Sequence, residues 1–148
     1  MRKTIPIALA EYGVTEHKGA TYHNPRILQY FKETGHLWVV GDQTAWCSCF
    51  ASWVAKKAGY NYSRKLTARS WLSIGQATYI PVVGDIVVFW REHLSSWKGH
   101  VGFYINHSRN RNYIYCLGGN QNNSVCIKAY PVKRLLGFRQ IHIKSSQG

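Results

Sequence analysis

The spacing of hydrophobic residues changes near residue 80, and this change constrains the fold more than any other feature. Before that point apolar residues recur at helical intervals, as in Phe50, Trp53, Val54 and Ala58. After it, short apolar runs of strand length alternate with turns that contain Gly and Asn. Helices that precede antiparallel strands indicate an α+β domain. The length of 148 residues fits one domain spanning 1–148.

The expected elements follow from this pattern and from cap residues. Asn24 followed by Pro25 is a typical helix start, with Asn as the cap and Pro in the first turn. Gly59 ends the central helix, and Lys56 and Lys57 precede it. We expect helices over 5–12, 24–33, 47–58 and 67–72, packed on about five antiparallel strands over 86–90, 101–105, 113–117, 124–128 and 137–143.

The chain is strongly basic, with 19 Lys and Arg against six Asp and Glu, a formal net charge of +13. Such a charge attracts polyanions, which include nucleic acid, anionic lipid and bacterial wall polymers. The basic residues are spread from Arg2 to Lys144. This distribution favours a generally cationic surface over a dedicated basic arm.

Cysteine usage argues against a disulfide scaffold and against structural zinc. The four cysteines include no CxxC pair, and there is no HExxH motif. We therefore expect no metal and no cofactor, and free thiols at Cys116 and Cys126. The apolar run near the N-terminus is short for a signal peptide, and no stretch is long enough for a membrane span. These features predict synthesis in the cytoplasm without a signal peptide.

Cys47 is the candidate nucleophile because it stands at the expected start of the central helix. The helix dipole and the free N–H groups there favour a thiolate, so we expect a lowered pKa. Cys49 would point roughly 200° away around the helix, which separates its role from that of Cys47. An imidazole beside the Cys47 thiol would complete a nucleophilic pair.

His100 is the candidate base among seven histidines. Gly99 and Gly102 flank it at the start of an expected strand, and small neighbours allow another element to come close. A catalytic imidazole also needs a group that fixes its tautomer and orientation. Asn120 is the preferred candidate, since an amide oxygen can accept from the second ring nitrogen, and Gln121 or Asn122 remain alternatives. For an oxyanion hole we expect the backbone N–H of Cys47 with a second donor from Gln43.

Several short motifs occur in an order that resembles a known family. The chain contains Trp46-Cys47-Ser48-x-Phe50, then Ala68-Arg69-Ser70-Trp71-Leu72, Gly84-Asp85-Ile86-Val87-Val88-Phe89, Gly99-His100-Val101-Gly102-Phe103-Tyr104 and Leu117-Gly118-Gly119-Asn120-Gln121. In this order they resemble the papain-like cell-wall hydrolases of the CHAP and NlpC type, in particular a compact subfamily found in phage lysis cassettes and type VI secretion loci.

The resemblance implies a papain-like fold and cleavage of an amide bond in peptidoglycan, either muramoyl–L-alanine or a bond within the stem peptide. It implies Cys47 as the nucleophile, His100 as the base and Asn120 as the third polar residue. Many relatives carry an acidic residue just before the asparagine, whereas this chain has Gly119 there, which leaves a Cys-His-Asn site. Trp46, Trp71 and Arg69 are the candidate substrate-binding residues. Core packing is the alternative for both tryptophans, and for Trp71 the two roles are equally favoured.

Two other classes of function fit the same sequence. A cationic, aromatic-rich module could bind wall polymer or nucleic acid without catalysis, although nucleic acid is the less favoured partner. A papain-like enzyme could instead act on protein substrates. Under the leading interpretation the partner is bacterial peptidoglycan, reached in the periplasm or wall of a target cell after secretion, injection or lysis. A cognate immunity protein would then be a second partner.

Overall fold

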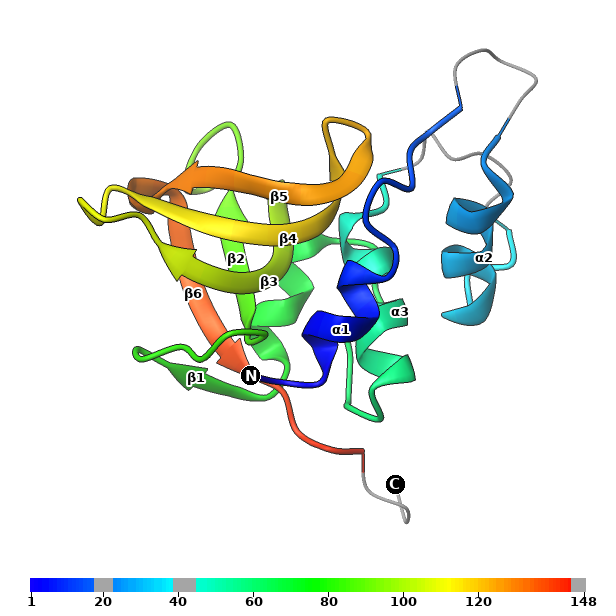
Figure 1. Cartoon of the computed structure of the whole chain (residues 1–148), viewed down its shortest axis with the longest axis horizontal. Helices are drawn as coiled ribbons and strands as arrows, with labels where there is room; N and C mark the ends of the chain where they lie inside the picture. The colour runs from blue at the N-terminus through cyan, green and yellow to red at the C-terminus, as the bar shows by residue number, and fades with distance from the viewer. Residues whose placement is uncertain (18–22, 39–44, 145–148) are drawn as a thin grey trace.

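The computed structural model describes residues 1–17, 23–38 and 45–144. Its helices lie on one side of a curved antiparallel sheet (Figure 1). The helical part comes first in the chain and the sheet second. The helices are α1 (Thr4–Leu9), α2 (Pro25–Glu33) and α3 (Cys47–Lys57), with 3-10 turns η1 (Ala68–Ser73) and η2 (Val132–Arg134). The strands are β1 (Gln76–Thr78), β2 (Ile86–Trp90), β3 (Gly99–His107), β4 (Tyr113–Gln121), β5 (Ser124–Pro131) and β6 (Leu135–Gln140).

The sheet has the order β1-β6-β2-β3-β4-β5, and each of its pairs is antiparallel. Phe89 of β2 lies opposite His100 of β3. One irregularity matters for the site, because the register between β4 and β5 shifts between Gly118 and Gln121. The end of β4 therefore carries a bulge where it passes the start of α3.

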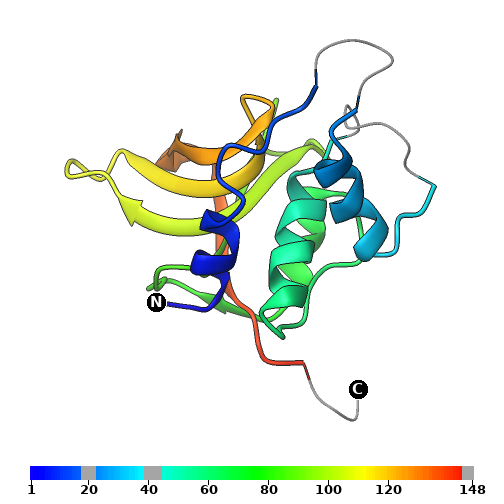
Figure 2. The same ribbon diagram turned by 45° about the vertical axis from the view of Figure 1, so that its right-hand side comes forward.

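Helix α3 is the centre of the core and lies between the sheet and α2 (Figure 2). Every residue from Cys47 to Ala55 is buried, as expected of a helix that is covered on more than one face. Gly119 of β4 allows the closest approach. A Cβ atom on it would lie 2.6 Å from Cζ3 of Trp46 and 2.8 Å from Cβ of Phe50.

The α+β class and the packing of N-terminal helices on an antiparallel sheet are confirmed. The sheet has six strands rather than five, because β1 is a three-residue edge strand that gives no periodic signal. The segment expected as a fourth helix is the 3-10 turn η1, and the last strand begins at Leu135. Within the described part of the chain no helix has the length and apolarity to cross a bilayer.

Candidate active site

Cys47 is the first residue of α3, and its side chain is buried against the sheet. Trp46 precedes it as the N-cap and makes no side-chain cap hydrogen bond, so the first N–H groups of the helix are free of a side-chain cap. Cys47 is only 5% exposed. Its thiol interacts with the backbone N–H groups of Ser48 and Val101. Since Val101 follows His100 in β3, the thiol lies at the end of the strand that carries the imidazole.

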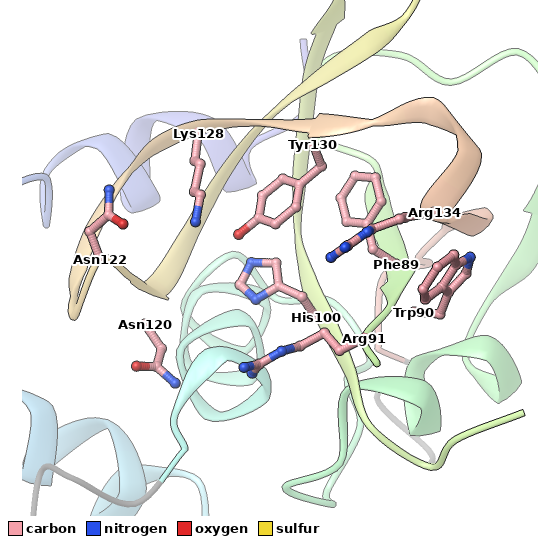
Figure 3. A pocket seen from close by; sticks show the side chains of 9 residues that line it. All are labelled: Phe89, Trp90, Arg91, His100, Asn120, Asn122, Lys128, Tyr130 and Arg134. Carbon is pink, nitrogen blue, oxygen red and sulfur yellow. The ribbon is translucent and has the colours of Figure 1, made fainter. Parts of the chain in front are cut away.

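His100 is buried by an aromatic stack. The Tyr130 ring lies nearly parallel to the His100 ring at 4.9 Å between centroids, and Phe89 stacks on Tyr130 at 4.6 Å. His100 is 4% exposed. The stack restrains rotation of the imidazole, and Figure 3 shows the His100 and Tyr130 rings next to each other in the cavity. No local pattern around Tyr130 pointed to this contact, because it depends on the pairing of β5 with β4.

Gln121 is the hydrogen-bond partner of His100. Oε1 of Gln121 lies 2.8 Å from Nε2 of His100, and Nε2 of Gln121 donates to the carbonyl oxygens of Cys126 at 2.6 Å and of Cys116 at 3.2 Å. These two carbonyls can only accept, so they fix which end of the amide faces the ring. The ring must then donate from Nε2. This tautomer leaves Nδ1 of His100 without a proton and able to accept one.

The expectation that Asn120 orients the imidazole is replaced by this hydrogen bond to Gln121. Gly118 pairs with Cys126 and Gln121 with Ser124, so β4 advances three residues while β5 advances two. Such a bulge moves the following side chain to the face that its predecessor would have occupied. Asn120 takes the left-handed backbone conformation, with φ of 57°. Its side chain lines the neighbouring cavity instead.

The electrostatics of the pair differ from the expectation of a lowered thiol pKa. Burial raises the pKa of Cys47, although the N–H groups of Val101 and Ser48 and the charge of Arg91 act in the opposite direction. Burial also lowers the pKa of His100 to about 4, opposed by its hydrogen bond to Gln121 and reinforced by the charges of Arg91 and Lys128. Near pH 7 the resting pair is therefore a neutral thiol and a neutral imidazole. In this state His100 is poised as a base.

A cavity of about 340 Å³ opens beside His100 and is bordered by cationic and amide side chains. Figure 3 shows its lining. The lining comes from the ends of β2 and β4, from the start of β3, from β5 and from η2. Its residues are Phe89, Trp90, Arg91, His100, Asn120, Asn122, Lys128, Tyr130 and Arg134.

Of the three predicted substrate-binding residues, the two tryptophans are core residues, whereas Arg69 has a structural contact and its substrate role stays a prediction. Trp46 and Trp71 are fully buried, and their Nε1 atoms donate to Oε1 of Glu16 at 2.8 Å and to Oγ of Ser48 at 2.9 Å. An indole without exposed surface cannot stack on a substrate. Arg69 donates to the backbone carbonyls of Lys98, Leu94 and His93. It thereby holds the loop between β2 and β3.

The predicted oxyanion hole is only partly described. The N–H of Cys47 is at the start of α3, where a helix has free donors. Gln43, the predicted second donor, lies outside the described residues, so it stays a prediction. Cys116 and Cys126 are both free thiols, as the sequence predicted.

The comparison with protein families matches residues 38–120 to the CHAP domain, which is more than half of the chain. The chain belongs to the CHAP domain family. CHAP domains are generally cysteine-dependent hydrolases that act on peptidoglycan. The match contains Cys47 and His100 and stops one residue before Gln121. No curated protein matches the chain.

Proposed function

We propose that this CHAP domain hydrolyses an amide bond of peptidoglycan, with Cys47 as nucleophile, His100 as base and Gln121 as the residue that orients the base. The bond is either the muramoyl–L-alanine amide or one within the stem peptide. The observation that carries the proposal is the hydrogen bond from His100 Nε2 to Gln121, because it leaves Nδ1 free on an imidazole next to the thiol-bearing helix end.

The reaction follows from these protonation states. The Cys47 thiol transfers its proton to Nδ1 of His100 as its sulfur attacks the substrate carbonyl. The developing oxyanion is stabilised by the N–H groups at the start of α3. The imidazolium then gives its proton to the leaving amine, and an acyl-enzyme forms. A water molecule, deprotonated by His100, attacks the thioester and releases the carboxylic acid and the thiol.

The charge of the protein fits this substrate. A formal net charge of +13 favours adsorption to an anionic wall. We place the enzyme in the periplasm or wall of a bacterial target, as a lysin or as an effector whose immunity protein would cover the Cys47 site.

The test is a digest of purified sacculi by the wild type, Cys47→Ala and Cys49→Ala, read by mass spectrometry of the released fragments. Cys49 is the matched control, because it is a second buried thiol of α3 whose sulfur lies 3.5 Å from Oγ of Thr34. We expect new fragments from the wild type and from Cys49→Ala and none from Cys47→Ala, and their masses name the bond. Equal release by all three proteins, or release by none across several wall chemistries, would refute the proposal.

A further inference from the structure

The cavity beside His100 carries three cations that the hydrolytic steps do not use. Arg91 follows the end of β2, Lys128 lies on β5 and Arg134 lies in η2. Figure 3 shows their side chains around the same space next to the imidazole. The charges of Arg91 and Lys128 are close enough to lower the pKa of His100. The cations therefore lie at the reacting end of the site rather than on a distant surface.

Aromatic rings hold two of these cations in place. Cζ of Arg134 lies 5.1 Å from the centroid of the Trp90 ring, and Nζ of Lys128 lies 5.5 Å from that of Tyr130. At these distances the ring face attracts the cation, so each charged group is held close to its ring. Because Tyr130 also stacks on His100, the same ring positions a charge and the base.

The cavity lacks a matching negative charge among the described residues. None of its described lining residues is acidic. The nearest acid in sequence is Glu92, an exposed residue outside the lining, whose carboxylate pairs with Nζ of Lys98 at 2.7 Å and is also attracted by the charge of Arg91. The three cations outnumber this one exposed carboxylate, and like charges that gather around one cavity repel one another, which costs stability. A cavity lined by one sign of charge attracts ligands of the opposite sign, so this arrangement favours an anionic ligand.

We propose that this cavity binds a free carboxylate of the substrate next to the scissile amide, and that the enzyme selects carboxylate-bearing over amidated wall peptides. This rests on the proposed function. Arg91 supplies a guanidinium that can bind a carboxylate through two hydrogen bonds. The amides of Asn120 and Asn122 add neutral donors at the same cavity. A carboxylate is the anion expected here, because the stem peptides of peptidoglycan carry carboxylates within one residue of their amides.

The experiment measures binding and cleavage of two soluble muropeptides that differ only by a carboxylate or a carboxamide beside the scissile bond. Binding is measured by calorimetry with Cys47→Ala, so that it does not depend on turnover. We expect the carboxylate ligand to bind at least about tenfold more tightly at low salt, and the preference to shrink at high salt. Adding Arg91→Gln to this protein should reduce the preference about three- to tenfold.

Arg109→Gln is the matched control, because it removes one exposed arginine charge in the turn between β3 and β4 and leaves the cavity unchanged. It should keep the full preference. Equal binding of the two muropeptides, binding of neither, or an equal loss from Arg91→Gln and Arg109→Gln would overturn the proposal. Cleavage of both muropeptides at equal rates by the wild type would overturn carboxylate selection and leave the proposed hydrolysis standing. Preferential binding without any cleavage would support the carboxylate site and refute the hydrolysis.

Discussion

Replacement of Gln121 by leucine removes the group that sets the tautomer of His100. When the ring becomes an imidazolium during catalysis, its hydrogen bond to Gln121 is charge-assisted and contributes about 1.5–3 kcal/mol. We therefore expect kcat/KM to fall about 10- to 150-fold in Gln121→Leu. The same change leaves the Cys116 and Cys126 carbonyls without the amide donor, since Gln121 is 1% exposed and bonds both. The expected loss of stability is about 2–4 kcal/mol.

The assay is kcat/KM on a soluble muropeptide, measured well below the melting temperature of each variant as determined by circular dichroism. Asn120→Ala is the comparison, because Asn120 precedes Gln121 and lines only the cavity. It should lose a few-fold at most, mainly through KM. If Gln121→Leu does not fold, the pH profile of Gln121→Glu tests the same hydrogen bond. A carboxylate next to Nε2 should raise the pKa of His100 and move the acid limb of the pH profile to higher pH.

The result that would refute this reasoning is a reversal of the two effects. A folded Gln121→Leu with wild-type kcat/KM, together with a loss of about 100-fold in Asn120→Ala, would assign the orienting role to Asn120. It would also mean that the bulge in β4 rearranges when substrate binds.

Three further results follow from the burial of the site. The kcat/KM of the wild type should stay near its maximum down to about pH 5, because the pKa of His100 is about 4 and the neutral imidazole is required. A fall in kcat/KM near the ordinary histidine pKa of about 6.5 would contradict this. Iodoacetamide should label Cys47 more slowly than a model thiol at pH 7, because burial raises its pKa; peptide mapping would measure this, and faster labelling would argue against the neutral pair. Gly119→Ala should lower the free energy of unfolding by about 1–3 kcal/mol, since its Cβ would overlap Trp46 and Phe50; an unchanged melting curve would show that β4 can move away from α3.

The fold class, the position of Cys47 at a helix start and the position of His100 at a strand start could be predicted because their signals are local. The helical spacing after Cys47 and the strand pattern after His100 can each be read within about ten residues. The order of helices before strands then places a helix end against the sheet. The structure shows the Cys47 thiol close to Val101, directly after His100. This contact joins residues far apart in the sequence and depends on how α3 packs on the sheet.

The third polar residue could not be chosen from the sequence because it depends on strand pairing. Asn120, Gln121 and Asn122 are adjacent amides with similar chemistry. Only the extra residue in β4 relative to β5 decides which of them faces the imidazole. Burial could not be predicted either, because the sequence around a tryptophan such as Trp46 does not distinguish an indole in a substrate groove from one in the core. The raised pKa of Cys47 also depends on burial by β3, which a reading of the helix start alone does not include.

The cavity charges and the basicity of His100 are coupled, and this gives the carboxylate site a catalytic consequence. Arg91 and Lys128 both lower the pKa of the imidazole. Arg91 also lowers the pKa of the Cys47 thiol, so its two effects on the transfer of a proton from Cys47 to His100 oppose each other, whereas Lys128 disfavours the imidazolium. A carboxylate bound between these cations would offset their charge within a few ångströms of the ring, where screening by salt is weak. The bound substrate would then raise the basicity of His100 at the moment the proton has to move. An amidated substrate cannot do this, so the discrimination should appear in kcat as well as in binding.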